Sequence, residues 1–295
     1  MAQPFNKGRP VVNGFESKAA AIRHLRAAGF NICTILGQPE SNPKVAKNGK
    51  VVNVMTAPMH LVPFNLSGFQ VCPKASKGCA AACLHYAGNP AYMEQKEKSR
   101  ITKTRAYFLQ RDAFMAVLVF EMLAHRRKWQ SKGYDVAYRL NATSDLPWEY
   151  RNFTIDGVDE HFMDYFSDCE FYDYTAIPKR AINWAHGLMP KNYHLTFSRK
   201  EDNHDDVVEV LREGGNVAAV AEKSVYDQAL ADGFMDIDTI KTTLRVNVTD
   251  GDAHDYRPMD PKGCLVVLKA KGDAKRDHTG FVIRHPSQNL LLAAE

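Results

Sequence analysis

The chain has 295 residues, which is enough for one large domain or two small ones. Hydrophobic residues make up 45% of it and charged residues 24%, proportions that exclude a disordered, collagen-like or coiled-coil chain. A net charge of +4 is too small to indicate a nucleic-acid-binding protein by itself.

Residues 1–50 are expected to form a small N-terminal extension and linker, and residues 51–295 the main domain. Within the extension, the Ala-rich segment 16–29 predicts a short helix that ends at a glycine. Residues 31–36 are expected to form an edge strand. The segment 38–50, rich in Pro, Asn, Gly and Lys, indicates a loop.

From residue 51 onward, short apolar segments alternate with segments of helical pattern. Strands are expected over residues 51–55, 60–66, 136–141, 170–174, 193–197, 216–221, 243–248 and 265–269. Helices are expected over residues 92–131, 158–166, 179–188, 205–212 and 224–231. Short strands separated by helices predict right-handed βαβ units and a parallel sheet. The number of units favours an α/β fold with a complete or partial TIM-like (β/α) barrel.

Polar side chains follow most of the predicted strands. In parallel α/β folds the ligand site is built at the carboxyl ends of the strands. We therefore predict four catalytic candidates, which are Asp145, Asp173, Ser198 and Glu222. Two further residues are candidates for cofactor binding, Asn141 and Ser144. The alternative is that these are ordinary loop residues, because loops are polar in any protein.

Six cysteines are too few for a secreted disulfide-rich fold, and the N-terminus lacks the apolar segment of a signal peptide. No run of about 18 apolar residues is present, so we expect no membrane contact. These features predict a protein of the reducing cytoplasm, where clustered cysteines are more often metal ligands than disulfides.

Three of the six cysteines, Cys72, Cys79 and Cys83, form a C-x6-C-x3-C cluster. Thiolates that lie close together repel one another unless a cation holds them, so this cluster predicts a metal centre. Cys33, Cys169 and Cys264 are scattered along the chain and are expected to act as small hydrophobic residues.

Two metal centres and one metal-free state are compatible with this loop. Three cysteines can bind three irons of a [4Fe–4S] cluster and leave the fourth iron open to S-adenosylmethionine. Alternatively, His85 completes a Cys3His zinc site. In the third state the cysteines stay reduced and buried. The loop follows the first predicted barrel strand, as the cysteines of radical S-adenosylmethionine barrels do, although their usual CxxxCxxC spacing and Gly-Gly-Glu motif are missing.

Several short motifs occur in a fixed order around the cysteine loop. They are Phe64-Asn65-Leu66, Tyr86-Ala87-Gly88, Arg139-Leu140-Asn141, Phe171-Tyr172-Asp173-Tyr174-Thr175 and Leu195-Thr196-Phe197-Ser198. Over residues 60–270 this order resembles the gene product 88 family of tailed bacteriophages and mobile elements. In that family Tyr-Ala usually follows the third cysteine directly, whereas here Leu84 and His85 intervene. The resemblance implies a phage origin, hence the host cytoplasm, and a TIM-like barrel; it implies no particular reaction.

We therefore expect a phage-encoded iron–sulfur enzyme of radical S-adenosylmethionine type that acts on a nucleotide-like or other small host metabolite. The alternative is a zinc-stabilised, non-enzymatic protein that contacts nucleic acid or a host protein. A nucleic-acid partner is suggested by a basic stripe on the predicted long helix, made of Arg100, Lys103, Arg105 and Arg111. In the segment Asp250–Asp255, Asp252 and His254 suggest a second divalent cation, although solvated acids explain it equally well.

Overall fold

The computed structural model of the protein describes residues 9–41, 43–86, 93–238 and 243–284. The strands are β1 (Val54–Pro58), β2 (Asp135–Arg139), β3 (Asn152–Ile155), β4 (Val158–His161), β5 (Glu170–Thr175), β6 (Tyr193–Ser198), β7 (Asn216–Ala221), β8 (Phe234–Asp238), β9 (Thr243–Asp250), β10 (Leu265–Lys269) and β11 (Val282–Ile283). The α-helices are α1 (Lys18–Ala27), α2 (Pro43–Val51), α3 (Lys77–Ala81), α4 (Met93–Leu109), α5 (Arg111–Gln130), α6 (Phe162–Tyr165), α7 (Pro178–Ala185), α8 (His204–Arg212) and α9 (Lys223–Asp232).

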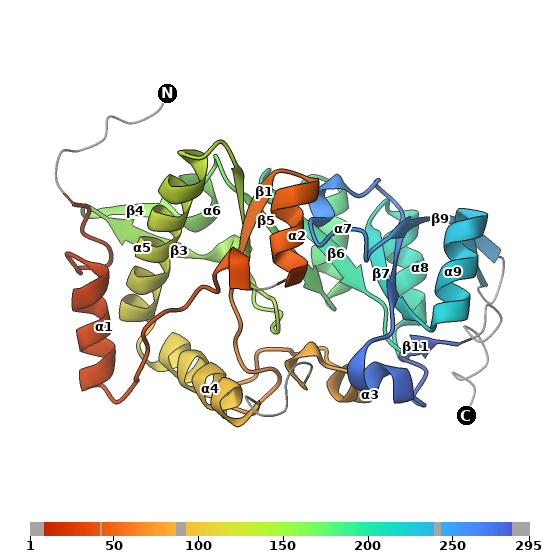
Figure 1. Ribbon diagram of the computed structural model, residues 1–295, viewed down its shortest axis with the longest axis horizontal. Coiled ribbons are helices and arrows are strands. Elements are labelled where there is room, and N and C mark those ends of the chain that lie inside the picture. Colours follow the sequence, from red (N-terminus) through yellow and green to blue (C-terminus); the bar gives the residue numbers. More distant parts are fainter. Residues whose placement is uncertain (1–8, 42, 87–92, 239–242, 285–295) are drawn as a thin grey trace.

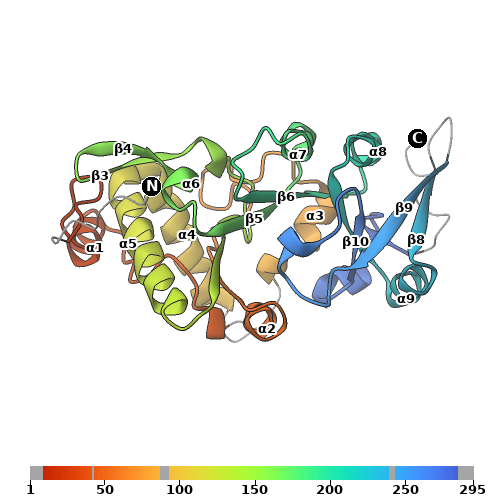
Figure 2. The ribbon, with the colours of Figure 1, turned by 90° about the horizontal axis from the view of Figure 1, so that it is seen from above.

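Most strands belong to one sheet with the order β1-β2-β5-β6-β7-β10-β9-β8, and β11 also pairs with β7. Every neighbouring pair in this sheet is parallel except β8 with β9. Helices α7 and α8 lie on one side of the sheet, and α2 and α9 lie on the other (Figure 2). The mixed α/β class with a mostly parallel sheet is thus confirmed.

The sheet is open in the part of the chain that the structure describes. Its path begins at β1 and ends at β8, and these two end strands do not pair with each other. A closed barrel is therefore not seen among these residues. Strands β1, β2, β5, β6 and β7 still follow one another in space as in chain order, and in Figure 1 α3 and α4 lie below the sheet.

Several predicted elements near the N-terminus differ from the structure. Residues 31–36 form no strand, and only Leu36 makes an isolated bridge, with Met59. Residues 38–50 are not a loop, because α2 occupies most of that segment. The predicted strand 60–66 is also wrong: these residues form no strand, and the backbone of Phe64 adopts a φ of 54°.

Two predicted helices are interrupted. The long helix predicted from residue 92, which lies outside the described residues, is divided into α4 and α5 at Gln110, whose φ of −137° is not helical. The helix predicted over 158–166 begins as strand β4 and becomes helical only in α6. Strand β4 pairs with β3 through the turn Asp156–Gly157, where both residues have positive φ, as a two-residue hairpin turn requires.

The N-terminal segment shares its core with α5. Leu25 and Val12 are fully buried in the same hydrophobic cluster as the apolar middle of α5. Glu121 of α5 accepts hydrogen bonds from the backbone N–H groups of Ile35 and Leu36 at 2.9 and 2.8 Å. The domain boundary at residue 50 stays a prediction. In the described residues, no helix is long and apolar enough to cross a membrane.

Candidate functional site

The cysteine loop begins beside the end of β2. The backbone N–H of Asp145 donates to the carbonyl oxygen of Val71 at 2.8 Å, which fixes the residue before Cys72. The thiol of Cys72 lies 3.8 Å from the carbonyl oxygen of Thr143. The hydroxyl of Thr143 in turn donates to the carbonyl oxygen of Leu61 at 2.6 Å. Cys72 is therefore held at the carboxyl end of a parallel strand, where such folds place their ligands.

The second cysteine lies beside the end of β6. Ser76 caps α3, and its hydroxyl accepts a hydrogen bond from the backbone N–H of Cys79 at 3.1 Å. The carboxylate of Glu201, which follows β6, accepts from the Ser76 hydroxyl at 2.8 Å and from the backbone N–H of Gly78 at 2.6 Å. A β-carbon on Gly78 would lie 2.2 Å from the hydroxyl oxygen of Thr279, so glycine is required for this close approach.

The three thiols lie near enough for their charges to interact. The pKa of Cys72 is raised to about 12, mainly by burial, with smaller contributions from the charges of Cys83 and Cys79. Burial raises the pKa of Cys79 to about 11, again with a contribution from Cys83. Burial also raises the pKa of Cys83. All three sulfurs are therefore neutral thiols at pH 7 unless a cation stabilises the thiolates.

Cationic side chains surround the third cysteine. Arg100 and Lys96 of α4 both lower the pKa of Cys83, in opposition to burial. The pKa of His60 is lowered to about 3, mainly by burial and to a smaller extent by the charges of Arg100 and Arg139, so this imidazole is neutral at pH 7. The site thus combines protonated thiols with the positive charges of Arg100 and Lys96 beside Cys83, which favour the binding of anionic groups.

Among the described residues, no three His, Cys, Asp or Glu side chains lie close enough together to hold one metal ion. Neither the three loop cysteines nor their combination with His85 forms such a group in this arrangement, and both predicted metal centres stay predictions. The ring of His85 lies instead between Arg100, at 2.9 Å from Nδ1, and Glu97, at 3.4 Å from Nε2. Both ring nitrogens have other neighbours, although the backbone N–H of His85 donates to the sulfur of Cys83 at 3.5 Å.

Three of the polar residues predicted at strand ends form one hydrogen-bonded group. The side-chain oxygen of Asn141 accepts from the Ser144 hydroxyl at 2.8 Å, and the Asn141 backbone N–H donates to Asp173 at 2.7 Å. The hydroxyl of Tyr193 donates to the other oxygen of Asp173 at 3.2 Å. These groups are buried, and their partners are mainly one another.

Asp145 belongs to a second buried group, centred on Arg180. The Arg180 guanidinium pairs with Asp145 and donates to both carboxylate oxygens of Glu149, at 2.7 and 2.8 Å. Asp145 also accepts from the hydroxyl of Thr175 and the backbone N–H of Ala176, at 3.2 and 2.8 Å. The hydrogen bonds of Asp145 fix the turn that carries Thr143. They therefore also fix the carbonyl oxygen of Thr143 that lies beside the thiol of Cys72.

Ser198 and Glu222 lie at the ends of β6 and β7, and within the described part of the chain neither is hydrogen-bonded to Asn141, Ser144 or Asp173. Glu222 pairs with Arg284 at 3.3 Å and accepts from Ser224 at 2.9 Å. Asp252, from the acidic segment, pairs with Lys271 at 2.7 Å, whereas His254 contacts Arg257. The structure therefore brings together Asn141, Ser144, Asp145 and Asp173, and places the other two candidates along the same edge.

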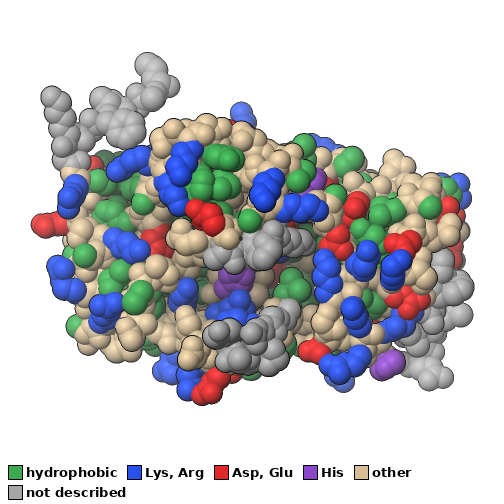
Figure 3. All heavy atoms as spheres, in the orientation of Figure 1, with side chains coloured by type: hydrophobic (Ala, Val, Ile, Leu, Met, Phe, Trp, Pro, Cys, Tyr) green, Lys and Arg blue, Asp and Glu red, His purple; other side chains and the backbone are tan. Residues whose placement is uncertain are grey.

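The predicted basic stripe does not form one surface. Arg100 and Lys103 are half-buried, and Lys103 donates to the carbonyl oxygen of Ile35 at 3.2 Å. Arg105 is exposed, and Arg111 lines a separate pocket. On the face shown in Figure 3, Lys and Arg side chains are interspersed with Asp and Glu rather than joined into a continuous stripe.

Sequence reasoning missed the residues that support the cysteine loop. Glu201 and Lys200 follow a predicted strand, but nothing in their spacing indicates contact with residues more than 100 positions earlier. Lys200 donates to the carbonyl oxygen of Lys74 at 2.7 Å. His60 belongs to a segment predicted as a strand, so its position near Arg100 is not evident from the sequence. The position of Glu201 just after a strand end is the one signal that pointed to it.

Comparisons with known proteins point to one family. A search of curated proteins found no match, and a search of solved structures found none either. The profile of the gene product 88 family matches residues 35–285, which include the cysteine loop, every predicted strand-end candidate and most of the parallel sheet. The chain therefore belongs to the gene product 88 family.

Proposed function

We propose that Cys72, Cys79 and Cys83 ligate a [4Fe–4S] cluster, and that the protein is an enzyme of radical S-adenosylmethionine type. Its substrate is a nucleotide-like or other small metabolite of the host cytoplasm, and its scaffold is a partial (β/α) barrel. The observation that carries the proposal is that three partly exposed thiols lie along the edge of the sheet where β2 and β6 end, near enough to influence one another's ionisation.

A cluster requires a less compact arrangement of thiols than a single ion does. Around one zinc ion every sulfur lies about 2.3 Å from the same centre. In a cluster each thiolate binds a different iron, so the sulfurs lie farther apart. The described residues offer no group tight enough for one ion, but the three thiols still influence one another's ionisation.

The chain also has charged groups that would bind S-adenosylmethionine beside the cluster. When bound, the cluster supplies an electron and an open iron for S-adenosylmethionine. Arg100 and Lys96 provide positive charge beside Cys83, suited to the carboxylate of that cofactor. Asn141, Ser144 and Asp173 are hydrogen-bonded to one another next to the segment that carries Thr143. We assign them the role of holding the end of β2 in place rather than of reacting themselves.

The test is the metal content of protein purified and reconstituted without oxygen. We expect about four irons and four sulfides per chain, with the charge-transfer absorption of a cluster. The variants Cys72→Ala, Cys79→Ala and Cys83→Ala should lose most of this iron. Cys33→Ser is the matched control, because Cys33 is exposed and far from the loop in sequence, and it should retain the full content.

A second measurement tests the reaction class. With dithionite as the electron donor, the reconstituted protein is expected to break the sulfur–carbon bond of S-adenosylmethionine. The products would be methionine and a 5′-deoxyadenosyl radical that becomes 5′-deoxyadenosine by taking a hydrogen atom from substrate or buffer, and the three loop variants should form neither. Stoichiometric zinc without iron, or iron that persists after all three cysteines are replaced, would overturn the proposal. If the protein binds the iron–sulfur cluster but does not cleave S-adenosylmethionine, the proposed metal centre stands and the proposed radical chemistry is wrong.

A further inference from the structure

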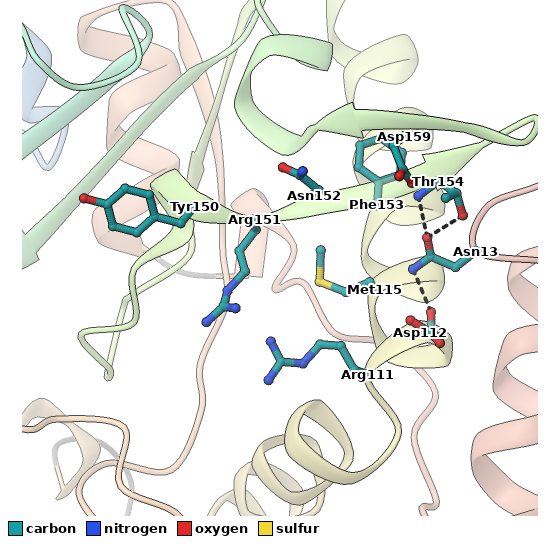
Figure 4. Close-up of a pocket in the computed structure, with 10 residues that line it drawn as sticks. All are labelled: Asn13, Arg111, Asp112, Met115, Tyr150, Arg151, Asn152, Phe153, Thr154 and Asp159. Carbon is teal, nitrogen blue, oxygen red and sulfur yellow. Dashed lines mark hydrogen bonds between the residues drawn. The ribbon is translucent and has the colours of Figure 1, made fainter.

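A pocket of about 430 Å³ lies away from the cysteine loop, between the first turn of α5 and strand β3 (Figure 4). Its volume falls within the range of small-ligand sites, which is roughly 300–1,000 Å³. Arg111 and Met115 of α5 contribute to its wall, and Tyr150 and Arg151 reach it from the segment just before β3. None of these residues contributes to the site described above.

Arg111, the first residue of α5, is held in position by Tyr107 near the end of α4. Its guanidinium carbon lies 3.7 Å from the centre of the Tyr107 ring, and its Nε donates to the carbonyl oxygen of Tyr107 at 2.6 Å. This cation–π contact orients the group and occupies only one of its five N–H donors. The terminal amino groups remain available to a ligand.

Arg151 lies near the same ring. Its guanidinium carbon lies 6.0 Å from the Tyr107 ring centre, and its Nε is buried without a hydrogen-bond partner. Figure 4 shows the guanidinium groups of Arg111 and Arg151 on the same side of the pocket. Within the described residues, neither group forms an ion pair with a carboxylate.

Two half-buried like charges are an unfavourable arrangement without an anion. Burial lowers the pKa of Arg111, and the charge of Arg151 lowers it further, while Asp112 opposes the change. The acidic residues of the lining, Asp112 and Asp159, are exposed to solvent, where water and salt screen them. In Figure 4 both lie on the opposite side of the pocket from the two guanidinium groups.

We propose that this pocket binds the phosphate of a nucleotide between Arg111 and Arg151. Guanidinium groups match phosphate geometry with paired N–H donors, and two of them can bind different oxygens of one phosphate. Met115 offers an apolar contact, and Tyr150, 69% exposed, extends its ring away from the two guanidinium groups, where it offers an aromatic face to a base at the margin of the pocket (Figure 4). The nucleotide can be free or the end of an oligonucleotide strand.

The probes are a nucleoside monophosphate, the same nucleoside without phosphate, and a short 5′-phosphorylated oligonucleotide, each titrated calorimetrically. The monophosphate should bind and the nucleoside should not. Arg151→Gln and Arg111→Gln should each weaken binding at least about tenfold, which corresponds to about 1.4 kcal/mol. Tighter binding of the oligonucleotide than of the monophosphate would identify the strand end as the ligand.

Three controls keep the result specific. Arg245→Gln removes an exposed arginine that pairs with Asp236 and should leave binding unchanged. Asp159→Asn removes a negative charge from the lining and should tighten binding. Arg111→Lys retains the charge but loses the paired donors, so it should fall between Arg111→Gln and the wild type.

The proposal is overturned if no phosphate-bearing probe binds at millimolar concentration, or if both glutamine variants bind as the wild type does. Arg151→Gln carries the test if loss of the Tyr107 contact unfolds Arg111→Gln. The iron content of these variants should remain that of the wild type, so failure here is distinguishable from failure of the cluster proposal.

Discussion

At the carboxyl edge of the sheet, burial controls the ionisation of Asp173 more strongly than its partners do. Loss of water raises its pKa to about 7, although the Asn141 backbone N–H, Arg139 and Arg180 all favour the ionised form. An unfolded aspartate has a pKa of about 3.9. Between these two values the folded chain holds a proton that the unfolded chain has released.

This difference predicts the pH dependence of stability. Because the folded state binds more protons between about pH 4 and 7, the free energy of unfolding falls as pH rises through this window. Asp173→Asn resembles the protonated carboxyl and should remove this contribution, on the order of a few kcal/mol. Urea unfolding of both proteins at several pH values measures the difference, and parallel curves would contradict the assignment.

At the level of elements, the cysteine loop depends on one carboxylate for its position. Glu201 is the acceptor for the backbone N–H of Gly78 and the hydroxyl of Ser76, both in or beside α3. A buried donor that loses its acceptor costs about 1–3 kcal/mol. Since α3 contains Cys79, movement of α3 would move that thiol.

We therefore expect Glu201→Ala to loosen the loop without unfolding the sheet. The thiols of Cys79 and Cys83, which are only partly exposed in the wild type, should react several times faster with a thiol reagent. Glu213→Ala is the matched control, because Glu213 is exposed at the end of α8 and pairs with His186, away from the cysteine loop. Equal labelling rates in the two variants would show that Glu201 does not hold the loop.

Local sequence signals predicted some elements well and failed at others for a physical reason. The Asp156–Gly157 dipeptide is a strong hairpin signal, yet the apolar residues after it favoured a helix over 158–166. Residues 60–66 have the composition of a buried strand, but their backbone groups pair with side chains instead of a strand. The N–H of Val62 donates to the hydroxyl of Thr104, and the carbonyl oxygen of Leu61 accepts from the hydroxyl of Thr143. Pairing partners, rather than composition, decide whether such a segment becomes a strand.

At the scale of the whole molecule, the N-terminal segment is packed into the main core. Leu25 of α1 is fully buried against the cluster that contains α5, and Lys18 pairs with Glu121 at 2.6 Å. A segment that buries its apolar face in this way should unfold together with the domain rather than separately.

Leu25→Ala is expected to lower the free energy of unfolding of the whole chain by about 2–5 kcal/mol. The measurement is a urea transition followed by the fluorescence of Trp129, Trp148 and Trp184, which lie outside the N-terminal segment. Leu188→Ala removes a leucine that is 71% exposed and should change the transition little. An unchanged transition in Leu25→Ala would show that the segment folds independently.

The sequence alone determined the alternation of strands and helices from β5 to α9, the helix α1, the cysteine loop and the family resemblance. These features depend on periodicity and short motifs, which act over a few neighbouring residues. Only the tertiary structure decided that the sheet stays open in the described residues, that Glu201 holds α3, and that Arg111 and Arg151 meet at one pocket. Each of these requires residues far apart in the chain to lie side by side, and strand order and side-chain partners are set by packing rather than by local pattern.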